Sequence, residues 1–382
     1  MITKEKIRTR VKKTGVNFIG PIDSINGLGL SARGYVSNLL NAGIPINIIN
    51  WTFGFEHVAK IPQSFPQEKK FSINIIHLNL DLITMFNSFD SEPIKNIIIG
   101  NTYNIGIVYW ELMSLHPEWH TTIHRFDEIW CASSFMVKAI SAVSSHPVKL
   151  VRPSITMATK IDDKFLSSIN LPRDRFIFFY TFDAKSVLER KNPSAFIESF
   201  IDEFSPEDGA CCLVKMMYSD GEISEINRLK ILAKDRKDVI FLEMLLSDDQ
   251  MSSLFHRIDC YVSPHRSEGL GLSIIEAMYS EKPVIATAYG GSSDFVTKKT
   301  AYPINYRLVE VGEGNAPYPP QYIWAEPDTE SLRKLMRMVF NDQIASKQIG
   351  IEGAKHIKNL FSLNNSSEKM KKELLNSINS SH

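Results

Sequence analysis

Cysteine, net charge and long apolar runs are all scarce in this chain of 382 residues. Its four cysteines form no Cys-x-x-Cys pair, so we expect buried thiols in a reducing compartment rather than a zinc site or a disulfide scaffold. Lys plus Arg and Asp plus Glu each number 43, which gives zero net charge. Proteins that bind nucleic acid through its phosphates are usually more basic, so no nucleic-acid partner is expected.

No run of about 18 apolar residues occurs, so no membrane-spanning helix is expected. The N-terminus is basic but lacks the apolar stretch of a signal peptide, which favours a cytoplasmic protein. The basic segment favours a solvated tail before the first strand, and the alternative is peripheral contact with anionic lipid at the inner face of the membrane. Its cations are Lys4, Lys6, Arg8, Arg10, Lys12 and Lys13.

Short apolar runs alternate with helical patterns, which predicts an α/β chain. The length and the 43% apolar content are enough for two domains. Several runs are continuous Ile/Val stretches, as expected for strands buried on both faces of a parallel sheet. A helix is predicted over Ser31–Ala42. The predicted strands of the first half are Val16–Gly20, Pro45–Asn50, Ile73–Leu78, Asn96–Gly100, Gly106–Trp110, Glu128–Ala132 and Val148–Val151.

A second series of strands begins after a polar, irregular stretch at residues 154–172, which we interpret as an interdomain linker. Its strands are Arg175–Thr181, Cys211–Lys215, Val239–Leu242, Asp259–Val262 and Pro283–Thr287, with helices at Pro193–Glu203 and Ile274–Tyr279. Two such series predict two doubly wound domains, at residues 1–160 and 173–360, with ligands at the carboxyl ends of the strands. Residues 310–322 are rich in Gly, Pro and Tyr and predict a loop. A polar helical tail over 361–382 is expected to cross back to the first domain.

The strongest constellation spans residues 263–278, where a strand leads through a glycine-containing loop into a helix. Gly269 and Gly271 let the backbone approach a ligand closely, and the helix start offers free N–H groups to an anion. Glu268 in the loop is placed to take sugar hydroxyls, and Glu276 in the first helical turns is placed to take two ribose hydroxyls. The alternative is a structural joint with two solvated glutamates.

Two adjacent cations, Arg190 and Lys191, form a second constellation at the carboxyl end of a strand. They precede a helix with Pro193 in its first turn. The Arg fork gives directional bonds and the Lys a point charge, so the pair suits a diphosphate. Read in isolation, two such cations would more often be solvated.

Two further motifs lie in the first half. Residues 26–32 fit G-x-G-x-x-A, but six residues separate the strand from the glycines and the second strand ends without a ribose-binding acid. We therefore expect a loop, with Gly27 and Gly29, that closes over a ligand. Glu111 follows a strand and is a candidate for contacting a sugar or orienting an acceptor hydroxyl. Its alternative is a helix cap beside packing tryptophans.

Several of these motifs together resemble the family 4 retaining glycosyltransferases. They are RKNP at 190–193, HRSEGLGL at 265–272, KPVIAT at 282–287, WAEPD at 324–328, YWEL at 109–112 and EIW-xx-S at 128–133. Glu268 and Glu276 match the E-x7-E motif of that family. The resemblance is specific over about 176–328 and weaker in the first half. It implies a GT-B fold, with two Rossmann-like domains facing across a cleft, and work on bacterial surface polysaccharides, often with mannose or rhamnose.

The resemblance also implies roles by position. Glu276 resembles the ribose-binding acid, Glu268 the acid that contacts the donor sugar, and Arg190 and Lys191 the diphosphate pair, with Gly29 under the pyrophosphate. The donor-binding set that it implies is Gly27, Gly29, Ser186, Arg190, Lys191, His265, Glu268, Gly269, Leu270, Gly271, Leu272 and Glu276. The catalytic set is Glu268, Arg190, Lys191 and Glu111, with His77 and His116 as candidates for the first-domain histidine of the family.

The expected activity is retaining transfer of a hexose, with a mannose-like sugar favoured, from a GDP- or UDP-sugar to a glycan or lipid-linked glycan acceptor. The chain contains no Asp-x-Asp, so we expect no metal, and the nucleotide-sugar is a substrate rather than a cofactor. The alternatives are a GT-B-like sugar-nucleotide epimerase and a catalytically silent scaffold that binds a sugar nucleotide.

Overall fold

The computed structural model describes residues 15–50, 71–79, 102–158, 160–217, 223–233 and 235–380. The chain divides into two units, residues 1–156 with 359–382 and residues 157–358. The predicted strand at 96–100 and the basic N-terminal segment lie outside the described residues. Within the described ranges, no helix is long and apolar enough to cross a membrane.

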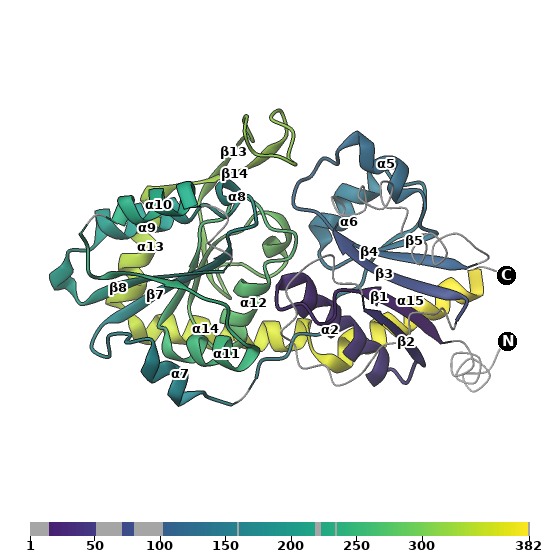
Figure 1. Ribbon diagram of the computed structural model, residues 1–382, viewed down its shortest axis with the longest axis horizontal. Helices are drawn as coiled ribbons and strands as arrows, with labels where there is room; N and C mark the ends of the chain where they lie inside the picture. The colour runs from purple at the N-terminus through teal and green to yellow at the C-terminus, as the bar shows by residue number, and fades with distance from the viewer. Residues whose placement is uncertain are drawn as a thin grey trace. The chain divides into compact units, whose positions relative to one another are not determined.

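The first unit is built on a six-stranded sheet in the order β2-β1-β3-β4-β5-β6, with every neighbouring pair parallel. Its strands are β1 (Val16–Gly20), β2 (Ile46–Asn50), β3 (Ile73–Asn79), β4 (Tyr103–Tyr109), β5 (Glu128–Cys131) and β6 (Val148–Leu150). Its helices are α2 (Gly27–Asn41), α5 (Pro117–Ile123), α6 (Ser134–Ser141) and α15 (Leu363–Ser380). Helices α2 and α15 lie on one face of the sheet and α5 and α6 on the other, as in a doubly wound fold (Figure 1).

Buried asparagines cross four strands of this sheet. The side-chain amide of Asn47 donates to Asn17, that of Asn17 to Asn74, and that of Asn74 to Asn104, at 3.1, 2.8 and 2.8 Å. The strand register places these residues side by side near the amino ends of the strands. Because buried amides must find partners, the ladder fixes this register within an otherwise apolar sheet.

The carboxyl-terminal helix α15 is tied to the sheet of the first unit through Glu128. This carboxylate is 1% exposed and accepts a hydrogen bond from the Ser377 hydroxyl at 2.6 Å. The Lys149 ammonium lies 2.9 Å from Glu128 and 3.5 Å from Glu373 of α15, and Trp130 also donates to Glu128. Residues 359–382 therefore belong to the first unit, where α15 packs along α2.

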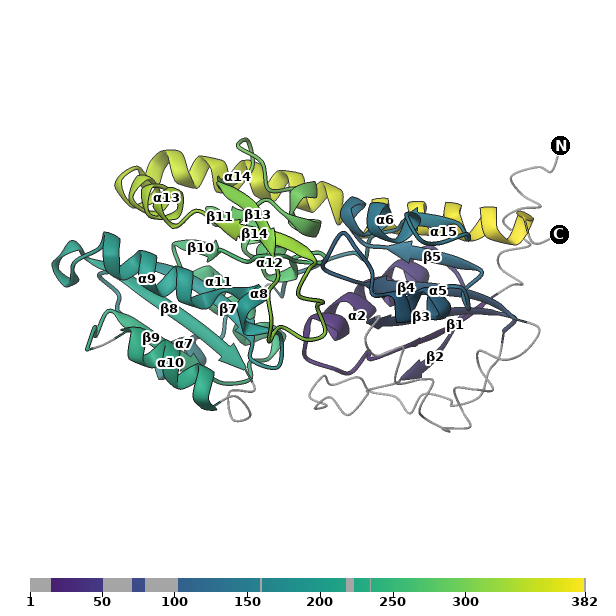
Figure 2. The same ribbon diagram turned by 90° about the horizontal axis from the view of Figure 1, so that it is seen from above.

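The second unit carries another six-stranded parallel sheet, in the order β12-β11-β10-β7-β8-β9. Its strands are β7 (Phe176–Asp183), β8 (Ala210–Met217), β9 (Val239–Glu243), β10 (Cys260–Ser263), β11 (Val284–Thr287) and β12 (Tyr302–Ile304). Its helices are α7 (Asp163–Ser168), α8 (Leu188–Lys191), α9 (Pro193–Glu203), α10 (Ile223–Ala233), α11 (Asp248–Arg257), α12 (Leu272–Tyr279), α13 (Thr329–Asn341) and α14 (Gln343–Leu360). In Figures 1 and 2, α9, α10 and α13 cover one face of this sheet and α11, α12 and α14 the other.

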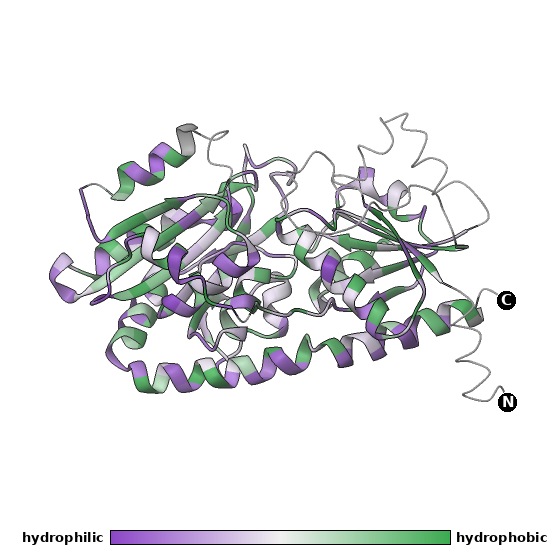
Figure 3. Ribbon diagram, turned by 60° about the horizontal axis from the view of Figure 1, so that its bottom comes forward, coloured by the Kyte–Doolittle hydropathy of each residue, from purple (hydrophilic) through white to green (hydrophobic). Residues whose placement is uncertain are grey.

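The strands of both sheets are largely hydrophobic, whereas the helices combine hydrophobic and hydrophilic turns (Figure 3). This pattern follows from burial of the strands on both faces, while each helix keeps one side in solvent. The four cysteines are buried and free, as the sequence predicts.

Two local expectations are corrected by the structure. The stretch expected to be an irregular linker contains α7, which begins after the capping residue Asp162, buries Phe165 and packs against α11. The predicted loop at 310–322 joins two strands that the sequence pattern did not reveal, β13 (Tyr306–Glu310) and β14 (Ile323–Pro327). They pair antiparallel as a hairpin outside the main sheet.

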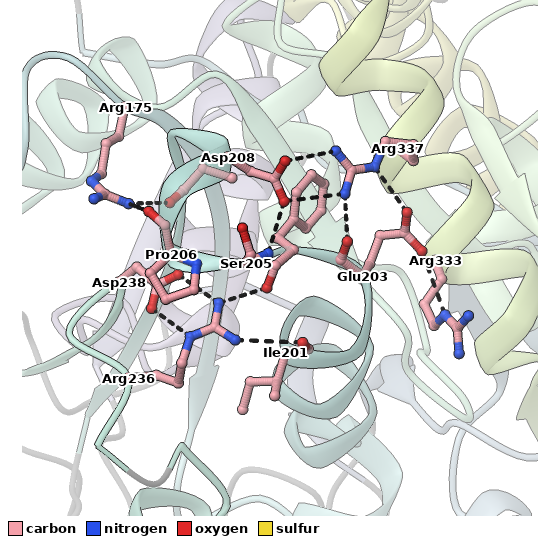
Figure 4. A network of polar contacts seen from close by, with 12 residues as sticks. Arg175, Ile201, Glu203, Ser205, Pro206, Asp208, Arg236, Asp238, Arg333 and Arg337 are labelled. Carbon is pink, nitrogen blue, oxygen red and sulfur yellow. Dashed lines mark hydrogen bonds and ion pairs between the residues drawn. The ribbon is translucent and has the colours of Figure 1, made fainter.

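An arginine network braces the second unit at the amino ends of its strands (Figure 4). Arg337 of α13 donates from Nε to Glu203 of α9 at 2.9 Å. Arg236 lies 2.6 Å from Asp238 and donates to the Phe204 carbonyl at 2.7 Å. These contacts join α9, α13 and the entry to β9, so the network is structural and leaves the opposite, carboxyl edge of the sheet for a ligand.

Candidate active site

The loop that follows β10 turns sharply into α12. Gly271 caps the helix with a φ of +87°, a conformation that favours glycine, and the helix begins at Leu272. Within the loop, Gly269 and Leu270 are buried, and Leu272 at the start of the helix is half-buried. The free N–H groups of the first turn of α12 therefore lie at the carboxyl edge of the sheet, where an anion would be stabilised.

A second loop brings the two predicted cations to the same edge. Arg190 and Lys191 end the short helix α8, and Asn192 adopts a left-handed φ of 55° before α9 begins at Pro193. The Asn192 amide donates to the Pro264 carbonyl at 3.1 Å, and the Arg266 backbone N–H donates to the Arg190 carbonyl at 2.8 Å. Since β7 and β10 are neighbouring strands, these bonds fasten the two loops together.

Glu268 joins both cations in one ion cluster. Its carboxylate lies 2.5 Å from the Lys191 ammonium and 3.3 Å from the Arg190 guanidinium, and the Glu268 side chain is 14% exposed. Arg190 also donates to the Ser267 carbonyl at 2.8 Å. Burial by itself raises the pKa of Glu268, but Lys191 and Arg190 outweigh it and lower that pKa to about 2. The carboxylate is therefore ionised at neutral pH and faces two fixed positive charges.

Two glycines in the loop after β11 contact the backbone at Glu268. Gly291 donates its N–H to the Glu268 carbonyl at 2.6 Å. A Cβ atom at Gly291 would lie 1.9 Å from the Gly269 carbonyl oxygen, and one at Gly290 would lie 2.3 Å from the Glu268 carbonyl oxygen. No side chain fits these close approaches, so the glycines are needed for the loop to hold its shape.

His265 differs from its expected role as a donor-binding residue. Its ring is fully buried, with Nδ1 3.0 Å from the Ser263 hydroxyl and Nε2 3.2 Å from the Ser292 hydroxyl. Burial lowers the pKa of His265 to about 4, so the ring is neutral at pH 7. Both nitrogens are engaged within the unit, and His265 therefore supports the loop instead of facing a ligand.

Two other predicted donor-binding residues lie on separate elements of the same unit. Glu276 is half-buried on α12. Ser186 lies in the turn after β7, where its N–H donates to the Asp183 carbonyl at 3.0 Å. It lines a cavity of about 530 Å³ together with Glu189 and Arg266. Arg266 extends from the site loop to this cavity and pairs with Glu189 at 2.8 Å.

The remaining predicted residues lie in the first unit, and the expected glycine loop is corrected there. Gly27 and Gly29 form the first turn of α2, which is capped by the Asn26 side chain, and the helix begins four residues before Ser31. A Cβ atom at Gly29 would lie 1.9 Å from the Ser24 carbonyl oxygen. The packing of the helix against its own leading turn thus accounts for Gly29.

The two candidate histidines of the first unit differ in their surroundings. His77 is fully buried, and its Nε2 lies 2.9 Å from the Ser31 hydroxyl, which is also 2.5 Å from the Tyr109 hydroxyl. Burial lowers the pKa of His77 to about 3, so it is a neutral core residue. His116 caps α5 by accepting the N–H of Glu118. The cap engages Nδ1 of His116 but not its Nε2, and the His116 side chain is 32% exposed.

Glu111 is half-buried just after β4. The neighbouring Trp110 and Trp119 pack edge to face, with ring centroids 4.4 Å apart. The two tryptophans thus pack against each other, and the cap of the following helix α5 is His116 rather than Glu111. Across the described residues, no three side chains of the His, Cys, Asp or Glu type come close enough together to hold a metal ion.

Comparison with known proteins supports the class of protein that this site suggests. Residues 180–316, which contain the whole ion cluster, match the family model described as glycosyl transferases group 1. An alpha-1,3/1,6-mannosyltransferase of Dictyostelium discoideum is 25% identical over 298 residues, which cover 73% of this chain and 60% of that protein. An uncharacterized glycosyltransferase of Methanocaldococcus jannaschii is 30% identical over 132 residues, 32% of this chain and 37% of that one. The chain therefore spans less than two thirds of either relative.

Solved structures share the fold across nearly the full chain. Sucrose-phosphate synthase from Thermosynechococcus elongatus superposes with a TM-score of 0.67 at 15% identity, covering 97% of this chain and 100% of that one. HepE of Anabaena, in complex with UDP and glucose, gives a TM-score of 0.66 at 11% identity, covering 94% and 99%. The fold is GT-B, as predicted, and the predicted resemblance is confirmed as a match to the group 1 glycosyl transferases over residues 180–316.

Proposed function

We propose that this protein is a retaining glycosyltransferase that moves a hexose from a nucleotide-diphospho-sugar to a hydroxyl of a glycan acceptor in bacterial polysaccharide synthesis. The observation that carries the proposal is the cluster of Arg190, Lys191 and Glu268 at the carboxyl edge of the second sheet. It lies inside the segment that matches the glycosyltransferase family model.

The cations of the cluster supply the chemistry that a leaving diphosphate requires. When the glycosidic bond to the donor breaks, negative charge grows on the diphosphate. Lys191, Arg190 and the N–H groups at the start of α12 would stabilise it, without a metal ion. Because the cations are held in place by Glu268 and by backbone bonds, little reorganisation is needed when the charge develops.

Glu268 would hold the donor sugar through a hydroxyl group. An ionised carboxylate accepts hydrogen bonds only, so it orients the sugar and favours the positive charge that develops at the anomeric carbon. In the proposed retaining reaction, the acceptor hydroxyl attacks the anomeric carbon from the same face of the sugar as the one from which the diphosphate leaves. The leaving phosphate then takes the acceptor proton, so the chain needs no separate base at that point.

The comparisons favour certain donors for this proposal. One relative is named a mannosyltransferase, which favours a mannose-like sugar, and a GDP-sugar is one of the two proposed donors. One fold neighbour is a complex with UDP and glucose, which keeps a UDP-sugar in the test set. A glycan or a lipid-linked glycan is the proposed acceptor.

A donor panel tests the proposal directly. GDP-mannose, UDP-glucose and other nucleotide-sugars are incubated with the protein, with and without a mixture of oligosaccharide acceptors, and nucleotide release is followed by chromatography. We expect release that depends on an acceptor, with a product of unchanged anomeric configuration. Isomerisation of the donor without an acceptor would identify an epimerase, and binding without turnover would identify a silent scaffold.

The variant Lys191→Ala tests whether turnover depends on the ion cluster. By analogy with the loss of one preorganised hydrogen-bond donor, we expect turnover to fall about 100- to 1000-fold. Lys334→Ala, which removes an exposed lysine from α13, serves as the matched control and should retain activity. Unchanged turnover in Lys191→Ala would show that the diphosphate is bound elsewhere.

A further inference from the structure

A lysine outside all the predicted motifs is buried near the site. Lys215 is 3% exposed and occupies β8 two residues before its carboxyl end. It pairs in register with Thr181 of β7, and Asp183 lies two residues further along that strand on the same face of the sheet. The side chain of Lys215 therefore lies at the carboxyl edge where the ion cluster is found.

Two carboxylates act on the Lys215 ammonium, Asp183 from β7 and Glu276 from α12. Burial lowers the pKa of Lys215 to about 8, although both carboxylates oppose this shift. The ammonium is thus largely charged at pH 7. None of the described residues forms a hydrogen bond with it or lies within 4 Å as an ion-pair partner.

The Lys215 side chain is buried, and its ammonium forms no hydrogen bond with the described residues, so its N–H groups are available to a ligand bound at this edge of the sheet. Glu276 occupies the position of the ribose-binding acid in the family that the chain resembles. A carboxylate accepts a hydrogen bond from a ribose hydroxyl but leaves the lone pairs of that hydroxyl free, and an ammonium can donate to them. A carboxylate and an ammonium that both reach one hydroxyl can thus bind it together, the carboxylate as acceptor and the ammonium as donor.

We propose that Lys215 donates to a ribose hydroxyl that Glu276 accepts from, so that the two residues select ribonucleotide donors over deoxyribonucleotide donors. This inference rests on the proposed function, because it assumes that a nucleoside diphosphate occupies the site. Hydrogen bonds to charged groups contribute enough for about a 10- to 100-fold preference.

Matched nucleotides test the inference by calorimetric titration. The ligands are UDP and GDP with their 2′-deoxy and 3′-deoxy counterparts, and the proteins are the natural chain, Lys215→Met and the surface control Lys334→Met. We expect the natural chain and the control to bind the ribonucleotide 10- to 100-fold more tightly than at least one deoxy counterpart. Lys215→Met should bind the ribonucleotide about tenfold more weakly and that deoxy counterpart with unchanged affinity.

Two results would overturn the assignment of Lys215. One is the absence of any ribonucleotide preference in the natural chain, and the other is an equal loss of affinity for both nucleotides in Lys215→Met, which would indicate a structural role. If the natural chain binds none of these nucleotides, the proposed function itself fails. The two failures are therefore distinguishable.

The natural chain offers a second measurement that does not depend on the folding of a variant. Between pH 7 and pH 9 the Lys215 ammonium loses its proton, so the preference for the ribonucleotide should decline several-fold. Asp183 and Glu276 are the charged groups that face the ammonium, and the phosphates and base titrate alike in the matched nucleotides. The ratio of affinities thus isolates the lysine, and a ratio independent of pH over this range would refute its role.

Discussion

Replacing Glu268 by glutamine keeps the shape of the side chain but removes the charge that balances Arg190 and Lys191. The cluster lowers the pKa of Glu268 from an ordinary value near 4.5 to about 2, which corresponds to about 3 kcal/mol in favour of the ionised folded form. A similar loss is expected when one partner of a buried ion pair is removed. We therefore expect Glu268→Gln to unfold with about 3 kcal/mol less free energy at pH 7.

The loss of unfolding free energy in Glu268→Gln should depend on pH, in a direction set by the lowered pKa of Glu268. A carboxylate with a depressed pKa stabilises the folded state above its unfolded pKa, near 4.5, and loses that contribution as pH falls toward 2. The advantage of the natural chain over Glu268→Gln should therefore be full at pH 7 and should shrink between pH 4.5 and pH 3. Urea unfolding at several pH values, followed by circular dichroism, measures this difference.

A bound nucleoside diphosphate should offset part of the stability that Glu268→Gln loses. It supplies negative charge to Arg190 and Lys191, so added GDP or UDP should raise the melting temperature of Glu268→Gln more than that of the natural chain. Glu352→Gln, which neutralises an exposed glutamate on α14, is the control and should change stability little. A stability gap well below 1 kcal/mol, or one that stays constant down to pH 3, would refute the reasoning from the ion cluster.

Three further substitutions test the supports of the fold and the site. Gly291→Ala places a Cβ atom 1.9 Å from the Gly269 carbonyl oxygen, so nucleotide binding measured by calorimetry should fall while the far-ultraviolet dichroism spectrum is retained; unchanged affinity would contradict the close approach. Glu128→Ala leaves Lys149 without its nearest carboxylate, and about 3 kcal/mol of unfolding free energy should be lost, with faster proteolysis in α15. Asn74→Ala interrupts the amide ladder and should cost about 1–3 kcal/mol in urea unfolding, and a neutral effect would show that the ladder does not stabilise the sheet.

The main strands could be predicted because they are buried on both faces and therefore read as continuous apolar runs. Val16–Gly20 and Pro193–Glu203 agree with the structure at both ends. The hairpin strand β13 could not be found in this way, because most of its residues are exposed and it pairs outside the main sheet. Helix α7 was missed because Phe165 is its only buried residue, which leaves no apolar face in the sequence.

The residues of the ion cluster could be named from their motifs, but their mutual contact could not. Lys191 and Glu268 are 77 positions apart, and they meet because β7 and β10 are neighbours in the sheet. The burial of His265 was hidden for the same reason, since its partner Ser292 comes from a third loop. Lys215 did leave a signal, a single cation inside the apolar strand CCLVKMM, but its meaning depends on carboxylates from two other elements.

The central claim is that fixed cations of the second unit, without a metal ion, bind the diphosphate of a sugar nucleotide and support its departure. The most direct measurement compares the turnover of the natural chain with that of Lys191→Ala, both in excess chelator, with the donor and acceptor that the panel identifies. The account predicts full activity in chelator for the natural chain and a loss of about 100- to 1000-fold for the variant. Activity that chelator abolishes and manganese restores, or equal turnover of the two proteins, would contradict it.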